Sequence, residues 1–221
     1  MPVAGMRVGV LLAGCGTHDG TEIGEALLTL LELERHGAHA RPLVPVGDQM
    51  HVVDHATGDE IEKDRRSMLS EAARLTRGQI ETLDAATASR LQAVIIPGGS
   101  GVVKNLMTGT LQAGVPRALL PQVRDLLTDC LDHGKPIGVM SVANFLLADL
   151  VDSKILPEHA GTTDEPLVVD EDRRLVYAPA YLTARSLADV AEGVSALVEL
   201  VLHFAGQPRQ AAAARPGGDP A

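Results

Sequence analysis

The sequence predicts an α/β fold: a doubly wound, mostly parallel sheet with helices on both faces, the three-layer sandwich of flavodoxin-like proteins. Short apolar runs alternate along the chain with longer segments of helical periodicity, which is the pattern of βαβ units. Glycine-rich stretches follow several of the apolar runs, as expected where strands turn into helices. The chain has 221 residues, 45% of them hydrophobic, which suits a single domain with a substantial core.

The first half of the chain contains three predicted strands and two predicted helices. The strands are short runs rich in Val, Leu and Ile, whereas the helices repeat apolar residues every three or four positions. The first helix stops at Gly37, because glycine is typical just after a helix. The predicted strands are 7–13, 38–46 and 91–99, and the predicted helices are 21–37 and 66–75.

The second half repeats the alternation and ends in a tail. A helix at 116–134 leads into a strand at 135–140, which runs directly into another helix at Ser141. Two short strands around an acidic turn follow within 166–179, and an amphipathic helix at 185–206 closes the domain. We therefore expect one domain over 1–205 and a flexible tail, rich in Pro, Gly and Ala, over 206–221.

Composition excludes several classes of partner. The net charge of -10 argues against nucleic acid or an anionic membrane surface. No apolar run reaches the roughly 18 residues of a membrane span, and the first residues lack a signal-peptide layout. Two cysteines, Cys15 and Cys130, form no disulfide framework, so a cytoplasmic location is expected.

Ligands of such sheets bind beyond the carboxyl ends of the strands. Three loops are expected there: GCGTHDGTE, PGGSGVVKN and MSVAN. Ser141 stands at the corner of the third loop, where a strand turns into a helix and a nucleophile is often presented. No GxSxG surrounds it, however, and no histidine follows it closely.

Motifs from about residue 7 to 205 resemble the ElbB branch of the ThiJ/PfpI superfamily. They include GCGTHDGTEIGEALLTLLELERHGA, MHVVDHATGDE, AVIIPGGSGVVKNL, GKPIGVMSVAN and DEDRRLVYAPAYL, in the same order. The resemblance implies glyoxalase-like proteins of the class I glutamine amidotransferase-like fold, acting on a small molecule without a cofactor. It also implies a homodimer, which the short segment before DEPLVV favours by leaving one flank of the sheet less covered.

Three departures from that family fall around the presumed site. Ser141 replaces the usual cysteine, in SVAN where the family resembles CIAP. His18 stands where the family usually has tyrosine, and the segment after the elbow is shorter. A serine hydroxyl starts many pKa units above a thiol, and a helix dipole worth roughly 1 kcal/mol cannot close that gap. Ser141 therefore needs a general base to act as a nucleophile, and otherwise only donates hydrogen bonds.

Glu25 is the first candidate for that base. The resemblance places it where the superfamily carries the glutamate that contacts its elbow residue, and burial there would raise its pKa. The alternative is an exposed glutamate that complements the helix dipole. Glu22, one turn earlier, is the competing site residue.

His18 is the second candidate, because it lies beside Asp19 in a loop at the catalytic edge. A loop histidine of this kind is equally consistent with a surface residue. His18, Asp19 and Glu22 lack the spacing of a metal motif, so no metal is expected.

Backbone and amide groups complete the predicted site. The glycine pair Gly98-Gly99 allows close approach to a ligand, and the resemblance assigns oxyanion donors to the N–H groups of Gly99 and Val142. Polar contacts to substrate are assigned to Asn105 and Asn144, although Asn144 could simply occupy a first helical turn. Cys15 could face the pocket or pack beneath its loop.

These residues predict a divergent enzyme that acts on a small carbonyl metabolite by acid/base chemistry of the hydratase, lyase, isomerase or cyclisation type. Two alternatives remain: glyoxalase-type conversion of methylglyoxal or glyoxal to hydroxy acids, and a non-catalytic relative that binds a metabolite or a protein. Polar replacements at positions 18, 141 and 144, rather than Ala or Gly, favour the enzyme.

Overall fold

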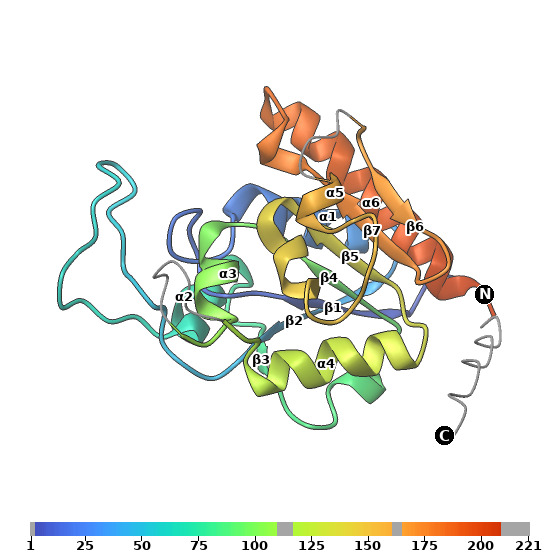
Figure 1. Cartoon of the computed structure of the whole chain (residues 1–221), viewed down its shortest axis with the longest axis horizontal. Helices are drawn as coiled ribbons and strands as arrows, with labels where there is room; N and C mark the ends of the chain where they lie inside the picture. Colours follow the sequence, from blue (N-terminus) through green and yellow to red (C-terminus); the bar gives the residue numbers. More distant parts are fainter. Residues whose placement is uncertain (1–2, 110–116, 161–164, 209–221) are drawn as a thin grey trace, which may run out of the picture.

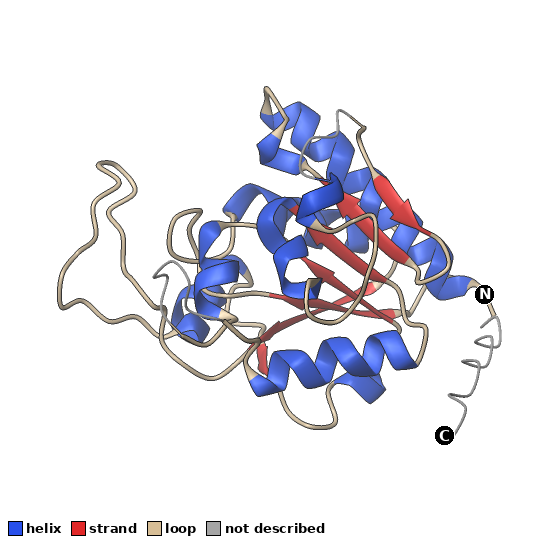
Figure 2. Ribbon diagram, in the orientation of Figure 1, coloured by secondary structure: helices blue, strands red, loops and turns tan. Residues whose placement is uncertain are grey.

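The computed structural model describes residues 3–109, 117–160 and 165–208. Over these residues a seven-stranded sheet runs through the molecule with helices on both sides (Figure 2). The strand order is β3-β2-β1-β4-β5-β7-β6. The strands are β1 (Arg7–Leu11), β2 (His39–Val44), β3 (Glu81–Thr82), β4 (Ala93–Ile96), β5 (Ile137–Met140), β6 (Val168–Asp170) and β7 (Leu175–Ala178).

The strand pairing confirms the predicted fold class. Every neighbouring pair is parallel except β6 with β7, which form the antiparallel hairpin expected within 166–179. The helices that connect and cover the strands are α1 (Ile23–Arg35), α2 (Met68–Leu75), α3 (Ser100–Asn105), α4 (Pro121–Asp132), α5 (Pro157–Ala160) and α6 (Leu187–Gly206). Short 3-10 turns are η1 (Ala88–Arg90), η2 (Ser141–Leu147) and η3 (Ala180–Leu182).

The two faces of the sheet bury two separate clusters of side chains. Alternate residues point to opposite faces of a strand, so Ala93 and Ile95 of β4 join one cluster while Val94 and Ile96 join the other. The first cluster packs against α1 and α6, and the second against α4 and η2 (Figure 1). Since the aromatic content is only 2%, aliphatic side chains dominate both clusters.

Two local features differ from the sequence-based expectation. The segment after Ser141 is a 3-10 turn of seven residues, not an α-helix. The loop after β4 contains the short helix α3. The last predicted helix extends to Gly206, as expected. Most of the expected tail, 209–221, lies outside the described residues. Residues 48–67 extend away from the sheet as a long arm (Figure 1), with pairing between Val53 and Glu60.

Candidate functional site

Ser141 occupies a strained corner at the carboxyl end of β5. It is buried, and its φ of 49° lies in the left-handed region that non-glycine residues rarely adopt. The strand before it, β5, lies between β4 and β7 in the sheet, and the 3-10 turn η2 begins with Ser141. Such strain costs of order 1–2 kcal/mol and concentrates at functional sites. The backbone therefore keeps the nucleophile-elbow geometry although the residue is serine.

Glu25 projects from the first turn of α1 into the protein and is fully buried. One carboxylate oxygen, Oε2, accepts a hydrogen bond of 2.6 Å from the N–H of Gly98. The other, Oε1, accepts a longer bond of 3.4 Å from the N–H of Tyr181. Burial raises the pKa of Glu25 to about 7, with a further increase from Glu22, while the two backbone N–H groups oppose the change. A carboxyl group with this pKa can both give and take a proton at neutral pH.

Gly98 brings Ser141 and Glu25 to the same point. A Cβ atom at residue 98 would lie 2.6 Å from Cβ of Ser141 and 2.8 Å from Oε2 of Glu25. No residue with a side chain fits there, since real Cβ contacts are not that short. The predicted meeting of the elbow, the glutamate and the glycine pair at one edge of the sheet is therefore what the structure contains.

Glu22 has a structural role in the same turn. Its Oε2 accepts a hydrogen bond of 2.7 Å from the N–H of Glu25, which caps the start of α1. Its own N–H donates to the carbonyl of Gly98 at 2.8 Å. Glu22 thus fixes α1 against the glycine pair, and of the two glutamates Glu25 is the one that approaches Ser141.

The predicted oxyanion donors lie beside this group. Gly99 has a φ of 106°, and a Cβ atom there would lie 2.6 Å from the N–H nitrogen of Glu22. Val142 is the second residue of η2, so its N–H has no acceptor within that turn. Their role in binding an oxyanion remains a prediction.

The loop 14–20 holds a second group of the predicted residues. The backbone N–H of His18 donates to Nε2 of His55 at 3.2 Å, and the two rings lie 4.9 Å apart. The carbonyl of His18 accepts from Lys104. His18 is exposed, and these contacts join it to His55 on the arm and to Lys104, not to Ser141 or Glu25.

The surroundings of Asp19 and Cys15 in this loop also do not favour a reactive role. Oδ2 of the buried Asp19 accepts a bond of 2.8 Å from the N–H of Val53, while Oδ1 lies 3.7 Å from Nε2 of His55. Burial and the nearby Glu71 raise the pKa of the half-buried Cys15 thiol, which disfavours the reactive thiolate. Asp19 thus links the loop to the arm, whereas Cys15 packs partly buried against one of the two core clusters.

The two predicted substrate-binding amides are occupied by backbone partners. Nδ2 of Asn105 donates to the carbonyls of Ala13 and Asp19, both at 2.8 Å, and its Oδ1 accepts from Met50. Nδ2 of Asn144 donates to the carbonyl of Ile155 at 2.9 Å. Both asparagines are buried. Their side chains hold loops together, so the contacts differ from the expected role in binding substrate.

A fourth loop at this edge was missed by sequence reasoning. The turn η3 follows β7 directly, and Ala180 has a φ of 47°, a second strained position. This turn directs the N–H of Tyr181 at Glu25. β7 lies beside β5 and parallel to it, so its carboxyl end reaches the same edge of the sheet. Ligands bind at that edge, and this rule could have pointed to the loop after β7 from the sequence.

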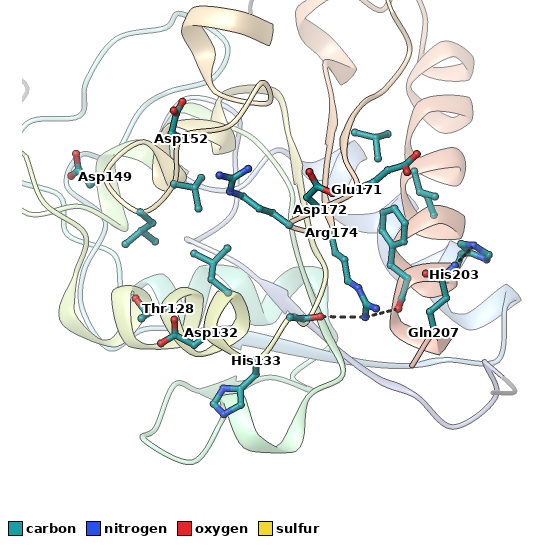
Figure 3. A pocket seen from close by; sticks show the side chains of 18 residues that line it. Thr128, Asp132, His133, Asp149, Asp152, Glu171, Asp172, Arg174, His203 and Gln207 are labelled. Carbon is teal, nitrogen blue, oxygen red and sulfur yellow. Dashed lines mark hydrogen bonds between the residues drawn. The ribbon is translucent and has the colours of Figure 1, made fainter. Parts of the chain in front are cut away.

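A cavity of about 1140 Å³ lies elsewhere, at the amino end of β5 (Figure 3). Arg174 crosses its floor, where the guanidinium donates to the carbonyls of Gly134, Phe204 and Pro208. Its lining includes five carboxylates, those of Asp132, Asp149, Asp152, Glu171 and Asp172. The cavity lines the flank that the shortened segment was expected to uncover.

The described residues form neither a metal-binding cluster nor a membrane-spanning helix. In these parts of the chain, no group of three or more His, Cys, Asp or Glu side chains is arranged to hold a metal. Nor does any described helix have the length and apolar character needed to cross a membrane.

Comparison with known proteins identifies clear relatives, although no family model matches the chain. The mitochondrial ES1 protein homolog of Rattus norvegicus is 33% identical over 91% of this chain and 85% of its own length. The mitochondrial glutamine amidotransferase-like class 1 domain-containing protein 3 of Homo sapiens is 33% identical over 94% of this chain and 86% of its own.

Among solved structures, an isoprenoid biosynthesis protein with an amidotransferase-like domain from Ehrlichia chaffeensis is also similar. It has a TM-score of 0.80 and 29% identity, over 90% of this chain and 100% of its own. More distant ThiJ/PfpI and DJ-1 superfamily structures share the fold alone. The predicted ElbB-like resemblance within that superfamily is confirmed.

The relatives contradict the expected location. The rat and human proteins, and a third from Danio rerio, are all named as mitochondrial. The cytoplasmic prediction rested on cysteine content and on the lack of a signal-peptide layout, and neither property distinguishes the cytoplasm from another reducing compartment. On this comparison the prediction was wrong.

Proposed function

The chain belongs to the ES1 family of glutamine amidotransferase-like class 1 proteins, and we propose that it is an enzyme that moves protons on a small carbonyl compound. The observation that carries the proposal is the state of Glu25. It is buried against Gly98 beside Ser141, and its pKa of about 7 lets it act as acid and base in turn.

The proposed reaction begins with removal of a proton next to the carbonyl group. Glu25 takes this proton as a carboxylate, and the substrate becomes an enolate. The hydroxyl of Ser141 donates a hydrogen bond to the carbonyl oxygen as negative charge develops there, with the predicted help of the Gly99 and Val142 N–H groups. In an isomerisation, Glu25 then returns the same proton to a neighbouring position of the enolate. In a lyase or dehydratase step, the enolate expels a hydroxyl or other group from the β-carbon, and Glu25 gives the proton to that departing group, so protons balance in both cases.

His18 has no part in this scheme, because its described contacts are with His55 and Lys104. Ser141 acts as a hydrogen-bond donor and not as a covalent nucleophile. The strain at Ser141 and Ala180 supports an enzyme over a passive binder, since strain at two places around one carboxylate serves pre-organisation.

Exchange of carbon-bound hydrogen for deuterium tests the proposal without knowledge of the native substrate. Hydroxyacetone, dihydroxyacetone and methylglyoxal are incubated with the protein in D₂O and followed by NMR. We expect exchange on at least one of them, and a loss of 100-fold or more in Glu25→Gln, since general acid/base groups contribute about 10²–10⁴-fold.

The matched control is Glu34→Gln, an exposed glutamate on the same helix, which should retain the wild-type rate. If the wild-type protein exchanges no faster than Glu25→Gln on every compound, the proposal is wrong.

The glyoxalase alternative has its own test. Ser141→Cys would restore the usual thiol, and a lone substitution in an otherwise intact glyoxalase site would convert methylglyoxal to lactate. We expect little or no turnover, because position 18 and the segment after the elbow have changed as well. Robust turnover by this variant would instead favour a glyoxalase site in which oxygen has replaced the reactive sulfur.

A further inference from the structure

Gly24 leaves a notch in the surface of α1 between two oxygen atoms. A Cβ atom at this residue would lie 3.0 Å from the hydroxyl oxygen of Tyr181 and 3.2 Å from Oε2 of Glu22. Both distances are shorter than most real Cβ contacts, so even an alanine side chain would fill the space. Gly24 is only partly buried, and the notch can therefore be reached from solvent. We call this space the Gly24 notch.

The backbone at Gly24 does not itself require glycine. Gly24 is the second residue of α1 and does not have a positive φ. Glycine is among the least favourable residues inside a helix, because it loses the most conformational freedom on folding. What glycine provides at this position is the open space between the two oxygen atoms.

The Gly24 notch lies next to the proposed reaction site. The backbone N–H of Tyr181 donates to Oε1 of Glu25 at 3.4 Å, while its hydroxyl borders the notch. Oε2 of Glu22 accepts a bond of 2.7 Å from the N–H of Glu25 and borders the notch as well. Both residues therefore touch Glu25 on one side and the notch on the other. A substrate held at Glu25 by its carbonyl end can extend towards the notch.

The charges around the notch favour a cation. Burial, and then the negative charge of Glu22, raises the pKa of Tyr181, so its phenol stays neutral and its oxygen can accept a hydrogen bond. Burial is also the main cause that raises the pKa of Glu25, and Glu22 adds to it. An anionic group in the notch would be repelled by Glu22, whereas an ammonium group would be attracted to it.

We propose that the Gly24 notch binds an ammonium group of the substrate, which is then a small amino-carbonyl compound. The ammonium donates to Oε2 of Glu22 and to the hydroxyl oxygen of Tyr181. Both oxygens lie within 3.2 Å of one point, so a single group can reach them. Oε2 of Glu22 already accepts from the N–H of Glu25, and a carboxylate oxygen has a second lone pair for the ammonium. The identity of the substrate rests on the proposed function, whereas binding of the ammonium does not.

A bound ammonium group would also prepare Glu25 for its role. The titratable groups that face Glu25 are Glu22 on α1, Tyr177 on β7 and Tyr181 on η3, and none of these three carries a positive charge. A cation close to a carboxyl group lowers its pKa. From about 7 in the free protein, the pKa of Glu25 would fall, and more of it would be the carboxylate that removes a proton. A neutral substrate of the same shape would not produce this change.

Binding tests the notch without any reaction. The probes are 1-amino-2-propanol and 1,2-propanediol, which are similar in size, differ in one ammonium or hydroxyl group and lack a carbonyl. In NMR titrations at pH 7, we expect the amine to bind about 10-fold more tightly or better, because hydrogen bonds to charged groups are about twice as strong as neutral ones. Glu22→Gln removes the charge and Gly24→Ala fills the notch, so each should abolish the preference. Glu34→Gln, an exposed glutamate on the same helix, is the matched control and should keep it.

Equal binding of the two probes by the wild-type protein would overturn the proposal. So would a preference that survives in folded Glu22→Gln or Gly24→Ala. Far-UV circular dichroism checks the fold of each variant. Tyr181→Phe provides an independent variant, since it removes the hydroxyl and keeps the ring, and it should weaken binding of the amine.

Deuterium exchange then tests the identity of the substrate. Aminoacetone and hydroxyacetone are compared in D₂O under argon, and each rate is corrected for exchange in buffer. We expect Glu22→Gln to lower kcat/KM for aminoacetone about 10-fold more than for hydroxyacetone. For aminoacetone, the pKa of Glu25 seen in kcat should lie below the value of about 7 seen in kcat/KM, whereas for hydroxyacetone the two should coincide.

The two proposals fail in different ways. Exchange on hydroxyacetone with no preference for aminoacetone would overturn the amino-carbonyl substrate and leave the proposed function in place. No exchange on any carbonyl compound, together with tight binding of 1-amino-2-propanol that depends on Glu22, would contradict the proposed function and leave the ammonium site in place.

Discussion

The two ends of strand β5 differ in a way that shows what makes a reactive site. The amino end borders a cavity of about 1140 Å³ (Figure 3), whose rim carries carboxylates that are mostly open to solvent. The carboxyl end has Ser141, Gly98 and Glu25 packed at contact distance, with Glu25 fully buried. The larger space is bordered by solvent-exposed acids, and the tighter one holds a buried acid with a pKa of about 7.

Backbone strain separates the two ends as well, but it serves different purposes. At the carboxyl end, Ser141 and Ala180 adopt positive φ and surround a titratable group. At the amino end, Arg174 has a φ of 56°, yet its guanidinium is fully engaged with three carbonyl oxygens. The first arrangement positions groups for chemistry, whereas the second joins the ends of α4 and α6. Volume alone would select the amino end, whereas burial and strain select the carboxyl end that we propose as the site.

Glu25→Gln should give the largest effect on stability, and this effect should depend on pH. Burial raises the pKa of Glu25 from 4.5 to about 7, so between these values the folded protein holds a proton that the unfolded chain has lost. The stability of the wild-type protein therefore falls as pH rises through this window, by about 3 kcal/mol in total. The amide has no such dependence.

Urea unfolding of both proteins at pH 5 and pH 8 measures this difference. We expect the free energy of unfolding of Glu25→Gln, relative to that of the wild-type protein, to be about 2–3 kcal/mol higher at pH 8 than at pH 5. A constant difference across the range would mean that Glu25 is not held protonated by burial, and the contrast between the two ends of β5 would lose its basis.

Arg174→Ala tests the amino end and should have an intermediate effect. It removes hydrogen bonds to the carbonyls of Gly134, Phe204 and Pro208, and leaves partly buried acceptors unpaired at a cost of about 1–3 kcal/mol. Deuterium exchange should not change, because the site lies at the other end of β5. The neighbouring Arg173→Ala loses one partly exposed ion pair with Asp170 and should cost less than about 1 kcal/mol.

The fold was predictable because hydrophobic periodicity and glycine positions are local signals. They indicated the parallel sheet and placed three loops at its carboxyl edge, and the structure brings Ser141, Glu25 and the glycine pair together there. The direction in which a loop side chain points, by contrast, depends on distant parts of the chain and cannot be predicted from local sequence. His18 lies in one of those loops but contacts His55 on the arm, 37 positions further along the chain.

The contribution of η3 was also hidden from the sequence. Ala180 carries no sign of a positive φ, since alanine normally avoids that region. Only the tertiary neighbourhood, with β7 beside β5, imposes it. Asn105 and Asn144 were misjudged for a related reason: an amide near a site can bind substrate or backbone, and only the structure shows that backbone carbonyls occupy both.

Ser141→Gly should have the smallest effect on stability and the clearest meaning for the elbow. Glycine adopts a φ of 49° without the cost of about 1–2 kcal/mol that serine bears. The greater conformational entropy of glycine in the unfolded chain lowers the stability of the folded protein by about 0.4–1 kcal/mol. We expect a net stabilisation of about 0.5–1 kcal/mol in urea unfolding, together with a loss of deuterium exchange, because the hydroxyl that supports the enolate is gone.

Ser141→Ala is the matched variant, since it removes the same hydroxyl and keeps the strain. It should lose exchange activity to the same extent as Ser141→Gly but show none of its stabilisation. If glycine destabilises the protein, the elbow stores no strain, and if either variant keeps full activity, the hydroxyl of Ser141 has no part in the reaction. Stability and activity that change in opposite directions at this one residue would show that the carboxyl end of β5 gives up stability for chemistry, as the amino end does not.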